Sequence, residues 1–231
     1  MARVNIHCPR CQSAQVYRHG QNPKGCDRLR CRDCHRVFQL TYTYQARKPG
    51  MKELITEMAF NGAGVRDTAR TLKIGSNTVI RTFKKLAPKR ITSSPVTHAD
   101  VAFICELDEQ WSYVGSKARQ HWIWYAYNTK TGGVLAYTFG PRTDQTCREL
   151  LALLTPFNIG MLTSDDWGSY GREVPKNKHL TGKIFTQCIE RNNLTLRTRI
   201  KRLGRKTICF SRSVEIHEKV IGAFIEKHMF Y

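Results

Sequence analysis

The sequence predicts a multi-domain protein of the α/β class. Three observations lead to this: paired cysteines near the start, three short helical patterns after them, and a second half in which strand-like segments precede helices. We expect a small cysteine-rich module over residues 1–45, a helical module over 46–87, a linker over 88–100 and an α/β domain over 101–231. A hydrophobic content of 41% in 231 residues is enough for packed cores.

The charge of the chain indicates its partner. The net charge is +20, with a pI near 9.9, and such a field favours nucleic acid or an anionic membrane. No apolar run approaches the roughly 20 residues that span a bilayer, and the N-terminus shows no apolar signal-peptide stretch. We therefore expect nucleic acid as the partner and no membrane association.

The cysteine-rich module carries two CxxC pairs, Cys8 with Cys11 and Cys31 with Cys34. Each pair lets a tight turn direct two thiolates at one tetrahedral Zn²⁺, and 19 residues between the pairs (31 − 11 − 1) is typical of a zinc ribbon. So small a module needs a staple to fold. The nine cysteines are odd in number in a chain without a secretory signal, which favours metal over disulfides. Alternative ligands fit the spacing less well; they are Cys26, His7, His19 and His35.

The helical module has the pattern of a helix-turn-helix. Apolar residues recur at helical spacing from Met51 to Ala59, a second short helix is expected over residues 65–72, and a glycine-bearing turn follows it. Ser76 is expected to cap a third helix over residues 77–86.

The third helix is the expected DNA reader. Asn77, Thr78 and Arg81 lie near its N-terminal end, where a recognition helix contacts base edges in the major groove. The alternative is a small helical bundle that packs on a neighbouring domain.

The α/β domain is expected to begin with an antiparallel meander of three strands. Further helices and one strand follow. The expected strands are residues 101–114, 122–127, 134–139 and 159–162, and the expected helical segments are residues 144–154, 185–203 and 214–230.

Acidic residues stand at informative places in this domain. Asp108 lies inside the first expected strand, where Asp is disfavoured, and Asp165 and Asp166 follow the short apolar strand. Glu190 comes next, and residues 191–212 then hold eight Lys or Arg and no acid. Carboxylates beside such a basic segment suggest divalent cations with a polynucleotide laid across them. The alternative is that these acids are solvated surface groups.

The motifs of the chain resemble those of a known family. The segments LDEQWSYVG, SDDWGSYG and CIERNNLTLRTRIKRLGRKTICFSRS, with the zinc and helix-turn-helix modules before them, resemble the DDE transposases of the IS-one insertion elements. This resemblance covers essentially the whole chain. It implies a ribonuclease-H-like catalytic domain. In that family the transposase is a fusion product made by translational frameshifting, and its N-terminal half alone can act as a repressor.

The resemblance also implies functional residues. The metal-binding triad would be Asp108, Asp165 and Glu190, holding Mg²⁺ or Mn²⁺, and Arg197 would contact a DNA phosphate. The pattern D-x-W-x-x-Y favours Asp165 over Asp166, which stays a rival, as Glu109 does for Asp108.

The expected function is therefore that of a transposase. In the cytoplasm of a bacterium, at the nucleoid, it would act on double-stranded DNA: it would bind terminal inverted repeats, cleave DNA at the element ends and join them to target DNA. We expect at least a dimer, because two ends must meet. One alternative is a DNA-binding repressor with an inactive C-terminal domain. Another is a structure-selective nuclease that does not join strands.

Overall fold

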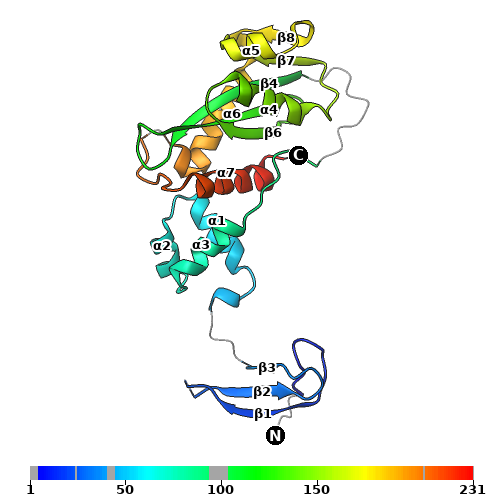
Figure 1. Ribbon diagram of the computed structural model, residues 1–231, viewed down its shortest axis with the longest axis vertical. Coiled ribbons are helices and arrows are strands. Elements are labelled where there is room, and N and C mark those ends of the chain that lie inside the picture. Colours follow the sequence, from blue (N-terminus) through cyan, green and yellow to red (C-terminus); the bar gives the residue numbers. More distant parts are fainter. Residues whose placement is uncertain (1–4, 24, 41–44, 94–103, 205, 231) are drawn as a thin grey trace. The chain divides into compact units, whose positions relative to one another are not determined.

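The computed structural model describes residues 5–23, 25–40, 45–93, 104–204 and 206–230. They belong to two compact units, Met1–Lys48 and Pro49–Tyr231 (Figure 1).

The first unit is a three-stranded antiparallel sheet with a very small core. Its strands, in the order β1-β2-β3, are β1 (Val16–Gln21), β2 (Asp27–Cys31) and β3 (Val37–Phe38), and a short 3-10 turn, η1 (Gln45–Arg47), closes the unit. Its buried apolar residues are Cys8, Leu29, Cys31 and Phe38. A core of this size cannot hold a fold alone, and two of its four members are cysteines of the predicted zinc set.

The second unit opens with the three predicted helices, α1 (Met51–Phe60), α2 (Val65–Thr71) and α3 (Ser76–Lys85). The prediction that Ser76 caps α3 is wrong, because Ser76 is the first helical residue and Gly75 is the cap. The backbone of Gly75 is extended (φ −73°, ψ 140°), and its carbonyl already accepts the first helical bond, from the Thr78 amide at 2.9 Å. Helix α3 therefore begins without a hydrogen bond from a capping side chain.

A mixed five-stranded sheet forms the centre of the second unit. The three strands β4 (Ile104–Tyr113), β5 (Gln120–Asn128) and β6 (Gly133–Gly140) make the predicted antiparallel meander. Two short strands, β7 (Met161–Ser164) and β8 (His179–Thr181), then add in parallel beside β4, which gives the order β6-β5-β4-β7-β8. Residues 101–103 of the first expected strand lie outside the described residues.

Helices cover both faces of this sheet, which confirms the predicted α/β class. They are α4 (Asp144–Leu154), α5 (Gly168–Glu173), α6 (Gln187–Arg199) and α7 (Val214–His228), with the 3-10 turns η2 (Lys176–Lys178), η3 (Lys183–Phe185) and η4 (Lys201–Leu203) between them. Neighbouring residues of β5 point to opposite faces. Trp124 accordingly packs in the core under α4 and α5, and Tyr125 in the core under α6 and α7.

Three details differ from the sequence prediction. The strand expected over residues 159–162 begins at Met161 and reaches Ser164, so that Asp165 follows it directly. Residues 168–173 form α5, where the sequence predicts only a turn over residues 167–170. Strand β8 was not predicted, because three residues show no alternation and its pairing with β7 alone makes it a strand.

The helix-turn-helix shares one hydrophobic core with the α/β domain. Helix α7, drawn in red in Figure 1, contacts α1 and α3 on one side, and Phe60 packs edge-on against Phe224 with ring centroids 5.2 Å apart. The buried Arg202 donates from Nε to the Ala59 carbonyl at the end of α1, at 3.1 Å. The helix-turn-helix is thus packed on the α/β domain and is not merely tethered to it.

Part of the expected linker also pairs with this domain. The Tyr137 amide of β6 donates to the Arg90 carbonyl at 2.9 Å, and the Thr92 amide donates to the Leu135 carbonyl at 2.8 Å. Residues 94–100 lie outside the described residues.

A glycine on α7 permits this close packing. A Cβ on Gly222 would meet the buried Tyr137 hydroxyl and lie 2.7 Å from Cγ of Pro88. We expect Gly222→Ala to destabilise the protein by about 1–3 kcal/mol, because overpacking outweighs the better helix propensity of alanine. The urea midpoint of unfolding measures this change. Gly171→Ala on α5 is the control, since nothing lies within 4 Å of its Cβ; equal midpoints for both variants would contradict the prediction.

Candidate active site and zinc centre

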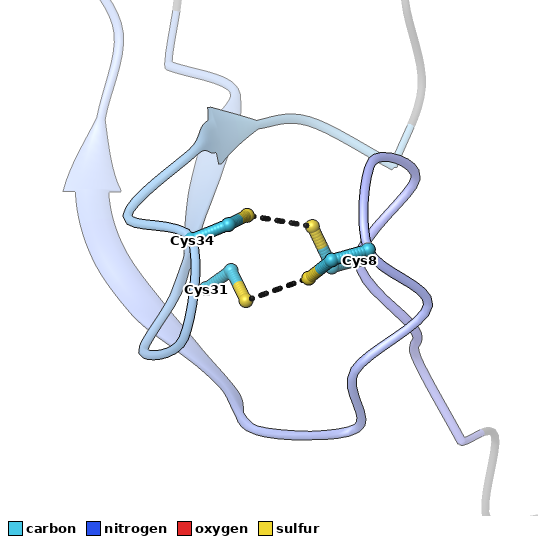
Figure 2. A group of neighbouring side chains, drawn as sticks. Cys8, Cys31 and Cys34 are labelled. Carbon is cyan, nitrogen blue, oxygen red and sulfur yellow. Dashed lines mark hydrogen bonds between the residues drawn. The ribbon is translucent and has the colours of Figure 1, made fainter.

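The four predicted zinc ligands converge in the first unit. The sulfurs of Cys8 and Cys34 are 3.5 Å apart, those of Cys11 and Cys31 are 3.6 Å apart, and all four lie within 4.8 Å of one another. Figure 2 shows the side chains of Cys8, Cys31 and Cys34 pointing toward one another. Four sulfurs at 2.3 Å from a tetrahedral zinc ion would be about 3.8 Å apart. The donor set therefore fits a structural zinc ion.

The backbone of both CxxC turns supports this arrangement. Each turn is followed by a residue in the left-handed region, Gln12 (φ 57°) after Cys11 and His35 (φ 55°) after Cys34. The sulfur separations are far longer than a disulfide bond of about 2.05 Å, so the cysteines are free thiols that can bind metal. Among the residues that the structure describes, Cys26 and the alternative histidines do not belong to the cluster.

The predicted DNA-reading residues lie on α3. Asn77 and Arg81 are exposed, and Thr78 is half-buried. Lys84 and Lys85 add exposed positive charge in the last turn of the helix. Arg197 lies elsewhere, on α6, close enough to Tyr125 for its charge to act on that buried hydroxyl.

Two of the three predicted catalytic acids meet at the centre of the sheet. Strands β4 and β7 are parallel neighbours, with Glu106 opposite Thr163. Two residues further along, this register brings Asp108 level with Asp165, the first residue after β7. Carboxylate oxygens of Asp108, Glu109 and Asp165 all lie within 4.8 Å of one another.

Asp108 is held in place by its neighbours. Its Oδ1 accepts from the Glu109 amide at 2.8 Å, and its Oδ2 accepts from Nδ2 of Asn193 on α6. The Tyr125 hydroxyl in turn donates to Oδ1 of Asn193 at 2.8 Å. The sequence alone leaves open whether Asn193 helps to fix Glu190 or touches DNA. The only signal for it is its position one helical turn after Glu190.

The electrostatics of the cluster favour a cation. Burial raises the pKa of Asp108 to about 7, and the charges of Glu109 and Asp165 contribute to the rise. Carboxylate oxygens are the ligands that Mg²⁺ and Mn²⁺ prefer, and a divalent ion would relieve the repulsion among these acids. The donor set therefore fits a divalent metal ion.

The structure places Asp165, and not the alternative metal ligand Asp166, in the acid cluster. Oδ1 of Asp165 accepts from the Trp167 amide at 3.1 Å, and its carboxylate belongs to the acid cluster. Asp166 is exposed, and within the described residues it belongs to no such cluster.

The structure also distinguishes Glu109 from Asp108. As adjacent residues of β4 they point to opposite faces of the sheet. The Glu109 side chain, 2% exposed, is paired with Arg142, whose Nε lies 2.6 Å from Oε1. Oε2 of Glu109 accepts from the Tyr170 hydroxyl at 2.8 Å. Glu109 thus has a cationic partner, Arg142, whereas no ion pair of Asp108 is found among the residues that the structure describes.

Glu190 is not brought into the cluster. It is exposed near the start of α6 and lies outside the group formed by Asp108, Glu109 and Asp165. Its helix nevertheless lies on the Asp108 face of the sheet, since Asn193 contacts Asp108 and the Ile189 amide donates to Oε2 of Glu106 at 2.5 Å. Glu190 stands between these two anchored points.

Known proteins provide the decisive comparison. A family model described as "IS1 transposase" matches residues 102–231, more than half of the chain. The chain belongs to the IS1 transposase family. A zinc-ribbon model described as the InsA N-terminal domain matches residues 1–35, and a helix-turn-helix model described as the InsA C-terminal domain matches residues 42–86.

Individual relatives agree with these matches. The insertion element iso-IS1n protein InsB of Shigella dysenteriae is 93% identical over 131 residues, which are 57% of this chain and 100% of that protein. The iso-IS1N protein InsA of the same organism is 92% identical over 84 residues, 36% of this chain and 93% of that protein. An IS1 InsB protein of Escherichia coli K12 is 46% identical over 147 residues, 63% of this chain and 88% of that protein.

The chain is thus an insertion-element transposase of the DDE type, with a DNA-binding part and a catalytic part. The helices in the described part of the chain are all too short or too polar to span a bilayer.

Proposed function

We propose that this IS1-family transposase recognises the terminal inverted repeats of its element with residues 1–87 and cleaves and joins DNA at the acid cluster. The observation that carries the proposal is that Asp108, in the middle of β4, meets Asp165, which directly follows the parallel strand β7, with their carboxylate oxygens within 4.8 Å. Carboxylates that serve only as solvated surface groups are not expected to converge within a sheet, because their charges repel one another there.

The proposed metal ligands are Asp108 and Asp165, with Glu190 joining them from α6, and the proposed metal is Mg²⁺ or Mn²⁺. Such ions supply charge stabilisation for the attacking and leaving oxygens of phosphoryl transfer. Asn193 keeps the Asp108 carboxylate in one orientation, and Glu106 fixes the start of α6 near it. No covalent link between protein and DNA is needed.

DNA recognition is proposed to use α3 and α6. Asn77, Thr78 and Arg81 would contact base edges in the major groove, and Arg197 a backbone phosphate near the acids. Because α3 shares a core with the catalytic domain, DNA held by α3 has a defined position relative to Asp108. Both ends of an element must be brought together, so we propose that the protein acts as a homo-oligomer on inverted-repeat and target DNA.

A product analysis tests this function. The full chain is incubated with labelled duplexes carrying the element ends and with a target plasmid, in Mg²⁺, Mn²⁺ or chelator. We expect cut ends and joined products only with metal. Binding without cleavage would support the repressor alternative, and cleavage without any joined product would support a plain nuclease; either result would overturn the proposal.

A further inference from the structure

A cavity of about 380 Å³ opens directly beside the acid cluster. It is lined by Arg142, Asp165, Asp166, Trp167, Gly182 and Lys183. Two cations thus face a space whose other charged groups are Asp165 and Asp166, which directly follow β7. The exposed Lys183 contributes from the segment after β8, and Arg142 from the segment between β6 and α4.

The guanidinium of Arg142 is held rigidly. Its Nε lies 2.6 Å from Oε1 of Glu109, and one of its terminal nitrogens contacts the same oxygen. Its central carbon lies 3.6 Å from the ring centroid of Trp167 and 5.1 Å from that of Trp122. An arginine fixed by a buried carboxylate and stacked on indole rings loses little entropy when it binds a further group.

Donors remain on this side chain. A guanidinium has five N–H groups, and Glu109 engages Nε and one terminal nitrogen. No other acceptor for Arg142, and no acidic partner for Lys183, is found within the described ranges. The Arg142 side chain is 33% exposed, so its remaining donors can reach a ligand. Planar donors of this kind suit phosphate oxygens.

We propose that Arg142 and Lys183 bind the DNA backbone phosphate that neighbours the scissile one, and that Glu109 serves to hold Arg142. This inference rests on the proposed function, because it presumes that DNA is cut at Asp108 and Asp165. The acid cluster repels a polyanion everywhere except at the metal-bound phosphate. Cations beside the acid cluster offset this repulsion and hold the DNA strand in a fixed position relative to the acids.

Neutral phosphate analogues test the contact. Element-end duplexes are made with a single methylphosphonate in place of each phosphate around the cut, and their affinity for the full chain is measured in chelator. We expect one substitution to weaken wild-type binding about tenfold, the size typical of a charged hydrogen bond. Arg142→Gln should lose about the same factor on unmodified DNA and show no further loss at that phosphate.

Further variants test the second cation and control for misfolding. Lys183→Gln at the cavity rim should weaken binding about threefold, as expected for an exposed phosphate contact. The double variant Glu109→Gln with Arg142→Gln leaves no buried charge unpaired and should bind like Arg142→Gln, which excludes misfolding as the cause. The matched control is Arg148→Gln, an exposed arginine on α4 paired with Glu173; it should behave like wild type.

The outcomes separate this inference from the function on which it rests. If the wild type cleaves DNA with metal but Arg142→Gln and Lys183→Gln bind unmodified ends like wild type, the phosphate contact is wrong and the function stands. If Arg142→Gln stays as sensitive as wild type to every methylphosphonate, the contact is also wrong. If the wild type never cleaves, the proposed function itself fails.

Discussion

Asp108→Asn and Asp165→Asn will each lower the rate of DNA cleavage and joining at least about a thousandfold, which corresponds to about 4 kcal/mol of lost transition-state stabilisation. Each change removes one negative charge from a cluster whose carboxylate oxygens lie within 4.8 Å of one another. An amide of the same shape keeps the packing but binds a divalent ion poorly. Cleavage of labelled element-end DNA in Mg²⁺ measures the effect, and DNA affinity in chelator should not fall below the wild-type level, because one repelling charge is removed.

Asp166→Asn is the matched control for this prediction. It makes the same charge change one residue further along, at an exposed side chain outside the cluster, and should keep activity within about threefold of wild type. A collapse of activity in Asp166→Asn with a harmless Asp165→Asn would reverse the assignment.

Glu190→Gln tests the third acid. If Glu190 joins the metal ligands when DNA is bound, this variant should fall as far as Asp108→Asn. Full activity of Glu190→Gln would remove Glu190 from the proposed ligand set.

Cys31→Ser will unfold the first compact unit and weaken DNA binding. Cys31 is fully buried in a core of four residues, so we expect the unit to depend on a metal ion bound by its thiolates. Structural zinc contributes about 10–16 kcal/mol of apparent folding free energy in small modules, more than such a core can replace. Zinc content should fall to background, and residues 5–40 should become sensitive to protease.

The second unit should be unaffected by Cys31→Ser. Its own core lies within residues 49–231, so its thermal transition should stay in place. Cys26→Ser is the control, because in the described residues Cys26 lies outside the sulfur cluster; it should keep its zinc. Zinc retained by Cys31→Ser would contradict the ligand assignment.

Local patterns in the sequence predicted most of the elements. The helices of the helix-turn-helix and the strands of the meander follow apolar spacing that is complete within each segment. Strand β8 and helix α5 escaped prediction because their segments are too short to show a period, and neighbouring elements stabilise them. The cap of α3 was misplaced by one residue because the extended backbone of Gly75 replaced a side-chain cap.

In the candidate site too, some residues could be predicted from local sequence patterns and others could not. Cysteine spacing identified all four sulfurs of the cluster, since two CxxC turns carry their geometry within a few residues. Asp108 stood out because an acid inside a strand needs a partner. The hydrogen-bond and ion-pair partners of these acids could not be predicted, because they are distant in sequence. Asn193 lies 85 residues away from Asp108, and Arg142 lies 33 residues away from Glu109.

The sequence by itself determined the class of the protein, its modules, the four cysteines that cluster and the acids worth testing, because each of these depends on residue type and short-range spacing. Only the tertiary structure decided that Asp108 and Asp165 meet, that Glu109 holds Arg142, and that the helix-turn-helix shares a core with the catalytic domain. The physical reason is that these contacts arise from the register of β4 beside β7 and from helices packed across the sheet. Strand register and helix packing join residues that no local pattern connects.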